Sequence, residues 1–490
     1  MQTADPELAL IPKFSFLIGG KRSQTGSGGA CDHIYAATGR PTVSVALAGR
    51  SEVDAAVAAA RAAFPAWRAM PVNQRRNLLL AAATIIEQHF DELVRLNVIE
   101  IANPIMQMRY TPALVIEQFR YCAGWADKIP GELISTWHGP AHDYAEHVPY
   151  GVIGSIIPWN GALYAAAMVL APALAAGNCV VLKPSELAPF TPLRLAELFL
   201  EAGFPEGVVN VIPGGAEAGE ALVSHPGVDK VQFVGSGGTA AKVLSAASAT
   251  LKPCGLELGG KSAVLVFEDA DLAVSPQLAL DGAISANGQG CVNGTRILVQ
   301  RKIYSAYVER LAALAAGIPI GDPFDEKTVL GPVVSLAACN RILGAVRHSV
   351  SGGKSRLVAG GERLGGDLSG GFFLPITLVA DVANQDSLAQ EEVFGPVLTI
   401  TPFDTEMEAI ALANDTRYGL GGYIHTRDLG RAHRVAAGMD AGMIQVNGLG
   451  GMSPAAPFGG FKQSGFGRLG GLAGIREFTQ VKNVYMSLGQ

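Results

Sequence analysis

The sequence contains neither a basic tract nor an apolar run long enough to span a bilayer. Gly, Pro or a charged residue interrupts each hydrophobic stretch, whereas a membrane-spanning helix needs about 20 apolar residues. The net charge of −6 disfavours nucleic acids and anionic membrane surfaces as partners. Residues 1–7 are acidic and lack the charged-then-apolar pattern of a secretory signal. We therefore expect a cytoplasmic protein that binds neither nucleic acid nor membrane.

Cysteine is sparse and shows no metal-binding or disulfide pattern. Six cysteines occur without CxxC or Cys/His spacing, at Cys31, Cys122, Cys179, Cys254, Cys291 and Cys339. This spacing is typical of reduced thiols in a cytosolic protein. Three of the nine histidines lie close together, at His138, His142 and His147. Their spacing suits no common metal motif, so we expect a polar exposed hairpin there and no metal site.

Length and apolar content indicate a folded protein with more than one domain. The chain has 490 residues, of which 49% are hydrophobic and 16% charged. From residue 151 short apolar segments alternate with helical stretches such as 191–201. Strands are expected at 152–157, 179–183, 208–212 and 230–234, and in a second half near 263–267, 296–299 and 397–403. This alternation predicts an α/β protein with doubly wound parallel sheets.

The two ends of the chain have other patterns. Ser51–Asp54 resembles a capping box that starts an Ala-rich helix running towards Phe64, and a second helix is expected after Pro71, to Glu87. Residues 131–150 are polar, with Gly139-Pro140 as a turn between extended pieces at 133–137 and 143–148. Residues 478–485 alternate like an edge strand.

Two segments contain residues that suit catalysis, a cysteine and a glutamate. Cys291 lies among Gly288, Gly290 and Gly294, so little side-chain bulk opposes the approach of a carbonyl carbon to the thiol. Upstream, Glu257 lies between two leucines, an environment that raises the pKa of a carboxylate and suits a general base. Each residue also has a plainer interpretation: a buried structural cysteine, and a carboxylate paired with Lys261 or a backbone N–H.

Together these segments resemble the aldehyde dehydrogenase superfamily over about Ser51 to Lys482. Seven segments match in the family's order: Pro158–Asn160, Lys183–Glu186, Phe233–Ser236, Glu257–Lys261, Gly288–Cys291, Glu391–Pro396 and Pro457–Lys462. The resemblance implies two doubly wound α/β domains, one of them a Rossmann-like cofactor domain, and a β-hairpin for oligomerisation. The implied boundaries are 1–128 and 150–256 for the NAD-binding domain, 257–465 for the catalytic domain, and 129–149 with 466–490 for the oligomerisation hairpin and C-terminal strand. That strand is expected to pair with a neighbouring subunit of a homo-dimer or tetramer.

The resemblance also implies roles for three residues in oxidising an aldehyde to its acid. Cys291 would be the nucleophile that forms a thiohemiacetal and then a thioester. Asn160 and the backbone N–H of Cys291 would donate hydrogen bonds to the oxyanion. Glu257 would activate the water that cleaves the thioester and would help to form the thiolate. Relatives that transfer the acyl group to coenzyme A commonly lack this base, so Glu257 favours water as the acceptor.

NAD is the implied cofactor, with NADP also possible. Lys183 and Glu186 would hold the adenosine ribose, and the carboxylate favours NAD because it repels a 2′-phosphate. The turn after Gly235 opens a helix whose N–H groups can meet the pyrophosphate, although Ala240 stands where the family usually has Gly. The residues expected at the cofactor are Ile156, Trp159, Lys183, Ser185, Glu186, Gly215, Gly235, Ser236, Leu258, Glu392 and Phe394.

Departures from the family pattern bear on the substrate. Gly161-Ala162 stands where an aromatic residue and Pro often occur, Met168-Val169 replaces the usual Trp-Lys, and the loop 447–453 lacks large aromatic residues. These changes remove bulk and charge, so we expect a wide apolar tunnel for a bulky hydrophobic or aromatic aldehyde. Its expected lining residues are Gly161, Met168, Gly290, Val292 and Met452.

Two alternatives remain open from the sequence. A semialdehyde dehydrogenase for a charged substrate would need a cation in the tunnel, and Arg296 is the nearest candidate in the sequence. A non-catalytic relative would keep the fold and the cofactor without the reaction, because fold does not guarantee function. The joint presence of Cys291, Glu257 and Asn160 favours an enzyme.

Overall fold

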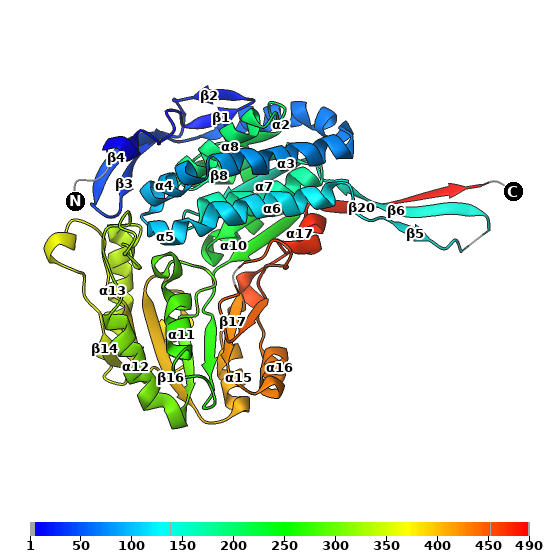
Figure 1. Ribbon diagram of the computed structural model, residues 1–490. Coiled ribbons are helices and arrows are strands. Elements are labelled where there is room, and N and C mark those ends of the chain that lie inside the picture. Colours follow the sequence, from blue (N-terminus) through cyan, green and yellow to red (C-terminus); the bar gives the residue numbers. More distant parts are fainter. Residues whose placement is uncertain (1–4, 138, 451, 489–490) are drawn as a thin grey trace.

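The computed structural model describes residues 5–137, 139–450 and 452–488, and two large sheets dominate it (Figure 1). His138, at the tip of the expected hairpin, lies outside the described residues. Most strand pairs in both large sheets are parallel. The predicted doubly wound α/β class is therefore confirmed.

The first sheet has eight strands. Their order is β19 (Gly465–Phe466), β11 (Cys254–Leu258), β10 (Lys230–Gly235), β7 (Val152–Ile157), β8 (Cys179–Pro184), β9 (Val209–Val211), β1 (Phe16–Ile18) and β2 (Lys21–Ser23). The strands from β11 to β9 are parallel, and every residue of β7 and β8 is buried. Such continuous burial is expected where helices cover both faces of a sheet. The boundary expected between residues 256 and 257 falls inside β11, which belongs to this sheet.

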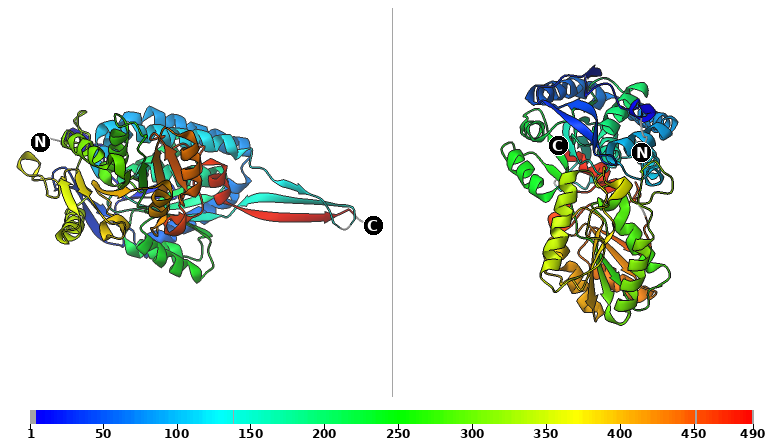
Figure 2. Two further views of the ribbon diagram at one scale, coloured as in Figure 1. Left: turned by 90° about the horizontal axis from the view of Figure 1, so that it is seen from below. Right: turned by 90° about the vertical axis from the view of Figure 1, so that its left-hand side faces the viewer.

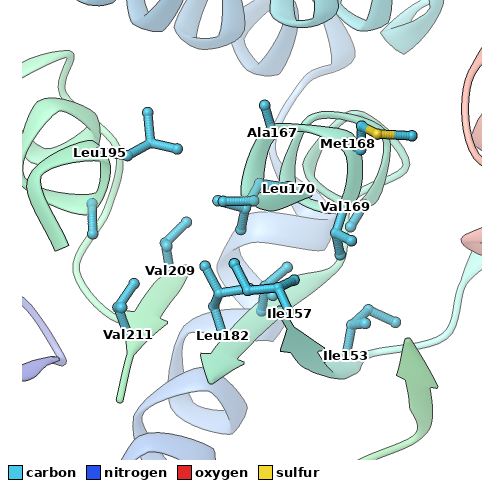
Figure 3. Packing of buried hydrophobic residues seen from close by; sticks show 14 of the residues in the cluster. Ile153, Ile157, Ala167, Met168, Val169, Leu170, Leu182, Leu195, Val209 and Val211 are labelled. Atoms are coloured by element: carbon cyan, nitrogen blue, oxygen red, sulfur yellow. The ribbon is translucent and has the colours of Figure 1, made fainter. Parts of the chain in front are cut away.

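Helices cover the first sheet in two groups. One group is α3 (Val72–Gln88), α6 (Tyr110–Ala126), α7 (Ala162–Ala175) and α8 (Phe190–Glu201), and the other is α2 (Arg50–Ala69), α9 (Ala216–Ser224) and α10 (Gly237–Ser248). α7 lies between the sheet and α6, so its apolar residues are buried all round. Leu170 of α7 packs near Leu182 of the sheet, while Met168 extends from another side of the helix (Figure 3).

The start and end of α2 differ from the sequence expectation. Gly49, rather than Ser51, is the N-cap, and its N–H donates to the Glu52 carboxylate at 2.8 Å. The helix also continues through Pro65 to Ala69. Its last turn buries Trp67 against Phe204, with ring centroids 5.5 Å apart. Packing of this large side chain outweighs the hydrogen bond that Pro65 removes.

The second sheet has seven strands and lies below the first in Figure 1. Their order is β14 (Arg356–Ala359), β15 (Thr377–Ala380), β16 (Val397–Phe403), β13 (Arg296–Gln300), β12 (Ala263–Val266), β17 (Gly421–His425) and β18 (Met443–Val446). Its helices include α11 (Ser275–Ile284), α12 (Tyr304–Ala316), α13 (Leu336–Ser351), α15 (Glu406–Asn414) and α16 (Leu429–Gly438). None of the helices that the structure describes has the length and hydropathy needed to cross a membrane.

A smaller sheet projects from the body of the molecule (Figures 1 and 2). It contains β5 (Glu132–Ile134), β6 (Ala141–Pro149) and the C-terminal strand β20 (Thr479–Ser487), with β6 in the centre. β20 pairs with β6 of the same chain along its whole length, from Thr479 opposite Pro149 to Ser487 opposite Ala141. The hairpin agrees with the sequence expectation, but the tail finds its partner strand within its own chain.

The N-terminus of α8 depends on a carboxylate from α4 (Phe90–Ile101). Pro189 occupies the N-cap of α8 and offers no capping side chain. The buried Glu100 replaces it: one oxygen accepts from the N–H groups of Phe190 and Thr191, and the other bonds the Thr191 hydroxyl. Burial raises the pKa of Glu100 to about 7, opposed by these hydrogen bonds.

Replacing Glu100 by Ala should destabilise the protein. The substitution leaves two buried N–H groups of α8 without an acceptor, so we expect the free energy of unfolding to fall by about 2 kcal/mol. Denaturant unfolding at pH 6 measures this, with Glu87→Ala, an exposed acid of α3, as the control.

The pKa of Glu100 is raised from the ordinary value of 4.5 to about 7 in the folded protein. The stability that comes from the protonated Glu100 is therefore lost as the pH rises from about 4.5 to about 7. Glu100→Gln mimics the protonated acid and should remove that pH dependence; equal slopes would contradict the assignment.

Candidate active site

The loop that carries Cys291 has an unusual backbone. Three consecutive residues before it, Ala286, Asn287 and Gly288, have positive φ angles of 52°, 56° and 77°. This conformation is unfavourable for residues other than Gly and persists only where surrounding contacts enforce it. A Cβ added at Gly288 would lie 2.3 Å from the backbone of Gly395 and Pro396. Gly288 therefore lets the cysteine loop touch the segment that follows Phe394.

Asn287 anchors this loop. Its side chain is fully buried, and its amide nitrogen donates to Asn103 Oδ1 at 2.8 Å and to the carbonyls of Ala102 and Pro332. Its Oδ1 accepts from the Gly331 N–H at 2.7 Å. Asn287 was not among the residues expected at the site, although Asn-Gly is a turn signal and Asn tolerates left-handed backbone.

The glycine beside the nucleophile has a structural role. A Cβ added at Gly290 would lie 2.3 Å from Asn293 Oδ1. Asn293 in turn donates to the carbonyls of Ala283 at 3.0 Å and Ser285 at 2.8 Å. The missing side chain at position 290 thus makes room for Asn293, and it does not by itself widen a tunnel.

The Cys291 thiol is half-buried, and its surroundings favour the protonated form. Burial raises the pKa of Cys291 to about 12, and the negative charges of Glu392 and Glu257 act in the same direction. All six cysteines are free thiols. At neutral pH, formation of a thiolate at Cys291 therefore requires a proton acceptor or an added positive charge nearby.

Asn160 joins the first sheet to the cysteine loop. It follows the carboxyl end of β7, and its Nδ2 donates to the Gln289 carbonyl at 2.8 Å. Gln289 is itself fixed, because its Oε1 accepts from the Val334 N–H at 2.9 Å. The structure thus places Asn160 directly beside the loop that carries Cys291.

Glu257 lies near the end of β11 and is 3% exposed. Neither of its carboxylate oxygens has a hydrogen-bond partner among the described residues. Burial raises its pKa well above the ordinary value, and Arg468 opposes the shift. The alternative pairing with Lys261 does not form, since the Lys261 ammonium also lacks a described partner.

Several expected cofactor residues gather at the carboxyl edge of the first sheet. Ile156 pairs with Lys183 across β7 and β8. The buried Lys183 donates to the carbonyls of Gly214 and, at 3.2 Å, of Pro184, and burial lowers its pKa to about 8. Ser185 lies next to Glu186, with 3.4 Å between the hydroxyl and Oε2.

The N-terminus of α10 is open. Ser236 caps it by accepting from the Thr239 N–H, and a Cβ added at Gly237, Gly238 or the α9 N-cap Gly215 would meet no described atom within 4 Å. In contrast, a Cβ at Gly235 would lie 2.7 Å from the Phe233 ring. The methyl group of Ala240, where the family usually has Gly, is buried in the main apolar cluster.

Glu392 and Phe394 lie where the two sheets meet. Glu392 Oε1 accepts from the Gly260 N–H at 3.1 Å, and burial raises its pKa. Phe394 has a positive φ of 54° and packs edge-on against Trp159, with ring centroids 5.5 Å apart. Leu258, also expected at the cofactor, is buried at the end of β11. These contacts bring the segment 391–396 to the Trp159 side of the site.

The expected tunnel residues lie in apolar surroundings. Met168 belongs to the main apolar cluster, and Met452 packs against it. Tyr121 and Trp125 of α6 and Tyr164 of α7 also pack against this cluster. Gly161 is the N-cap of α7, and a Cβ added there meets no described atom within 4 Å. Val292 is half-buried, and its carbonyl accepts from the Tyr423 hydroxyl at 2.9 Å.

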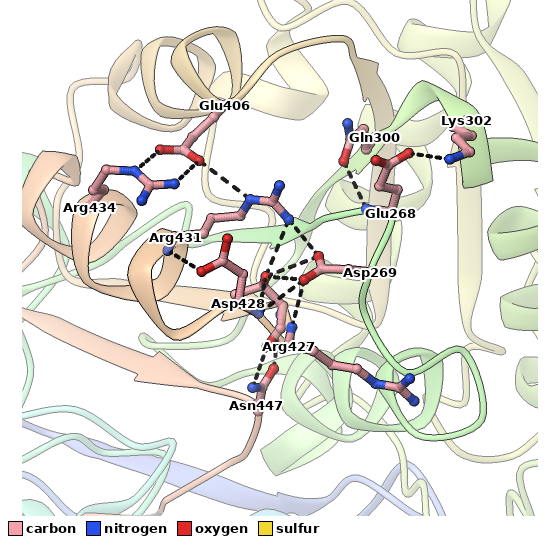
Figure 4. Close-up of polar contacts among 11 residues, drawn as sticks. Glu268, Asp269, Gln300, Lys302, Glu406, Arg427, Asp428, Arg431, Arg434 and Asn447 are labelled. Atoms are coloured by element: carbon pink, nitrogen blue, oxygen red, sulfur yellow. Dashed lines mark hydrogen bonds and ion pairs between the residues drawn. The ribbon is translucent and has the colours of Figure 1, made fainter.

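Polar contacts anchor the start of the loop 447–453 (Figure 4). Asn447 accepts from the Thr426 N–H at 3.0 Å and donates to the Thr426 carbonyl at 2.6 Å. The Thr426 hydroxyl donates to Asp269 at 2.8 Å, and Arg431 donates to the same carboxylate at 2.6 Å. The loop therefore leaves β18 from a defined position.

Arg296 does not provide the cation that a charged substrate would need. It is 1% exposed, and its guanidinium donates to Asn384 Oδ1 at 2.9 Å and to the carbonyls of Leu412 at 2.7 Å and Ala413 at 2.6 Å. These carbonyls belong to the last turn of α15, where a cation complements the helix dipole. The candidate role of Arg296 in a tunnel is therefore wrong.

Comparisons with known proteins agree with this fold. Residues 23–484 match the family model described as Aldehyde dehydrogenase family. The chain is 42% identical to an aldehyde dehydrogenase of Emericella nidulans, covering 91% of this chain and 89% of that one. It is 40% identical to a betaine aldehyde dehydrogenase of Sinorhizobium fredii, covering 98% of both. The NAD⁺ complex of an aldehyde dehydrogenase from Bacillus cereus superposes with a TM-score of 0.95 at 35% identity, covering 99% of both chains. The chain therefore belongs to the aldehyde dehydrogenase family.

Proposed function

We propose that this chain oxidises an aldehyde to its carboxylic acid with NAD, through a covalent intermediate on Cys291. The hydrogen bond from Asn160 to the Gln289 carbonyl carries the proposal. It joins the carboxyl edge of the first sheet, where ligands of such folds bind, to the loop that holds the thiol. Glu257 adds a buried carboxylate without a described partner at the same junction.

The side chains present suit a dinucleotide. The open N-terminus of α10 offers the N–H groups of Gly237 and Gly238 to a pyrophosphate. Lys183 and Glu186 stand at the end of β8 as partners for ribose hydroxyls, and the carboxylate favours NAD over NADP. Glu392 would hold the second ribose. Bound NAD would supply the hydride acceptor for the oxidation.

The first chemical step is addition of the Cys291 sulfur to the aldehyde carbon. The thiol proton passes to Glu257, whose raised pKa makes it a stronger base than an ordinary carboxylate. An amide nitrogen carries two hydrogens. One hydrogen of Asn160 holds the Gln289 carbonyl, and the other, with the Cys291 N–H, would stabilise the oxyanion. Such a donor is worth about 3 kcal/mol in the transition state.

Transfer of a hydride from the thiohemiacetal carbon to bound NAD would leave the thioester, and Glu257 must release the thiol proton to solvent before it can act as a base again. The second step is hydrolysis of this thioester. Glu257 accepts a proton from a water molecule, the hydroxide adds to the thioester carbon, and the C–S bond breaks to release the acid and the Cys291 thiolate. Glu257 is 3% exposed, and this apolar environment raises its pKa. The same group therefore serves the thiol in the first step and water in the second.

The substrate that we propose is a bulky hydrophobic or aromatic aldehyde. The open space at Gly161 and the apolar surroundings of Met168 and Met452 support it. The hydrogen bonds of Arg296 to the end of α15 speak against an anionic semialdehyde. Betaine aldehyde, named for a relative, carries a quaternary ammonium that aromatic faces attract, so it belongs in any substrate panel.

We also propose a homo-oligomer, dimer or tetramer, assembled through the projecting sheet. β20 forms one edge of this sheet, and an edge strand presents backbone groups to another chain. Exposed apolar side chains line it, with Val481 65% and Leu488 68% exposed. Leu133 of β5, on the other edge of the sheet, is also exposed, at 78%.

Replacing Cys291 by Ala should abolish NADH formation while NAD binding persists. Loss of a nucleophile typically costs roughly 10⁴-fold or more in turnover, whereas the expected cofactor contacts do not involve the thiol. Absorbance of reduced nicotinamide measures turnover, and calorimetric titration measures NAD binding. Cys254→Ala, at another half-buried thiol, is the matched control. Turnover retained by Cys291→Ala would overturn the assignment.

Glu257→Gln should slow hydrolysis of the thioester more than its formation. We expect a burst of up to one NADH per site, followed by turnover reduced by about 10²- to 10⁴-fold. Because burial raises the pKa of Glu257, wild-type turnover should fall as pH drops through that raised value, and the variant should lose this dependence. Stopped-flow absorbance across pH 6–9 tests both statements. Glu268→Gln, in a surface pair with Lys302, is the control; a variant with unchanged steady-state turnover would exclude Glu257 as the base.

The substrate proposal predicts that kcat/KM for an aryl aldehyde exceeds that for acetaldehyde by at least about 10-fold, a difference that a few methylene-sized contacts can supply. Gly161→Phe should reduce this preference, because the new ring occupies the open space at the start of α7. Gly161→Ala should have a smaller effect. Steady-state kinetics with a graded panel measures the ratio, and a preference for acetaldehyde in the wild type would contradict a wide tunnel.

A further inference from the structure

The guanidinium of Arg468 lies beside Glu257 without a hydrogen bond between them. A Cβ added at Gly459 would lie 2.8 Å from Glu257 Oε1 and 2.9 Å from Arg468 Nη1, so both atoms are within about 3 Å of one point. Both oxygens of Glu257 nevertheless lack a hydrogen-bond partner among the described residues. Arg468 therefore acts on the buried carboxylate through its charge, at a distance where that interaction is strong.

Other contacts hold the guanidinium in this place. Its Nη1 donates to the carbonyls of Gly460 at 3.0 Å and of Gly467 at 2.6 Å. The guanidinium carbon also lies over the Phe461 ring, 5.5 Å from its centroid. These partners fix the position of Arg468 but carry no negative charge, so they leave its positive charge to act on Glu257.

A carboxylate from α17 (Gly471–Glu477) packs on the strand that carries Glu257. Gly255 precedes Glu257 by two residues in β11, so the two positions share one face of the strand. A Cβ added at Gly255 would lie 3.0 Å from Glu477 Oε1. The other oxygen of Glu477 accepts from the Arg468 N–H at 3.4 Å. Glu477 thus brings a negative charge to the face of β11 that carries Glu257.

Lys230 of β10 holds Glu477 there. Lys230 is 3% exposed, and its Nζ donates to Glu477 Oε1 at 2.7 Å. The same ammonium lies over the Tyr150 ring, 5.1 Å from its centroid. Removing one partner of such a buried ion pair leaves the other charge uncompensated. The position of Glu477 is therefore fixed by the sheet beneath it.

Charged and titratable groups thus face Glu257 from three segments. Burial is the main cause that raises the pKa of Glu257, while the charge of Arg468 lowers it and that of Glu477 raises it further. From the cysteine loop, Cys291 also faces this carboxylate, whose charge raises the pKa of the thiol. In the proposed reaction Glu257 takes up and releases a proton twice. A group with this task works best when neither of its two forms is strongly favoured.

We propose that Arg468 and Glu477 are positioning residues that act on Glu257 with opposite effects. Arg468 stabilises the carboxylate form, which accepts a proton from the thiol or from water. Glu477, held by Lys230, stabilises the protonated form and so prevents the base from becoming too weak. Both act through Glu257 rather than on the aldehyde. The inference rests on the role proposed for Glu257 as the base of both steps.

Infrared difference spectroscopy tests this without substrate or cofactor, because a protonated carboxyl absorbs apart from carboxylates and amides. The wild type, Arg468→Met and Glu477→Gln are each compared with their own Glu257→Gln version across pH 5–10. The Glu257 carboxyl should titrate at a higher pH in Arg468→Met, which lacks the stabilising cation, and at a lower pH in Glu477→Gln. Equal midpoints in the three proteins, shifts of both variants in one direction, or no titration in this range would overturn the proposal.

The pH dependence of turnover adds a test that a purely structural role would not pass. On the acid limb, turnover at a fixed pH should fall by roughly 3-fold or more in Arg468→Met and rise by a similar factor in Glu477→Gln. Arg468→Lys keeps the charge and should stay closer to the wild type. Arg476→Met, at an exposed cation of α17, makes the same charge change and should leave the limb unmoved.

The Glu257→Gln background separates this inference from the proposed reaction. If Glu257 is the base, Glu257→Gln loses the acid limb, and adding Arg468→Met to it should move nothing further. An acid limb that persists in Glu257→Gln would contradict the proposed reaction itself. A limb that is lost in Glu257→Gln but unmoved by Arg468→Met, or activity lowered by one factor at every pH, would overturn only the role of Arg468 and Glu477.

Discussion

The contact between Asn160 and the Gln289 carbonyl is the interaction on which the arrangement of the site depends. The strands of a parallel sheet place side chains at its carboxyl edge. The first sheet alone cannot position the cysteine loop, which follows α11 of the second sheet. The cysteine loop reaches that edge only because Asn287 holds three left-handed residues in place and because Gly288 permits close backbone packing. A few buried polar contacts therefore position the thiol near enough to Glu257 for that carboxylate's charge to raise the pKa of Cys291.

Burial of ionisable groups is the second common feature of this region. Cys291, Glu257 and Glu392 all have pKa values raised mainly by burial, and each negative charge adds to the shift of the thiol. In contrast, the pKa of Lys261, which lies between Glu257 and Cys291 in the sequence, is lowered. Such groups are costly for stability because the charged forms lose hydration. Their accumulation at one junction is typical of a catalytic site, where proton transfer near neutral pH needs perturbed pKa values.

Regular elements were largely predictable from the sequence, because period and burial are local properties. The strands at 152–157 and 397–403 were predicted with the bounds that the structure has, and those at 179–183 and 230–234 differ by one residue. Errors occurred where tertiary contacts override local signals. The N-cap of α2 is Gly49, two residues before the expected Ser51, and the helix passes through Pro65 because Trp67 packs on Phe204. Nothing local to Glu100 indicates that it caps α8, since its partners Phe190 and Thr191 lie about 90 residues away.

The sequence by itself determined the alternation of strands and helices, the family resemblance and the identity of the groups available for chemistry. These follow from residue types, spacing and short motifs. Only the tertiary structure decided what each group contacts. It showed that Arg296, a possible tunnel cation, caps α15, and it paired the C-terminal strand with its own hairpin. It also excluded the alternative in which Glu257 pairs with Lys261. Hydrogen bonds and burial join residues that lie far apart in the chain. Packing of the two sheets, and not any local sequence pattern, decides which of these residues meet in space.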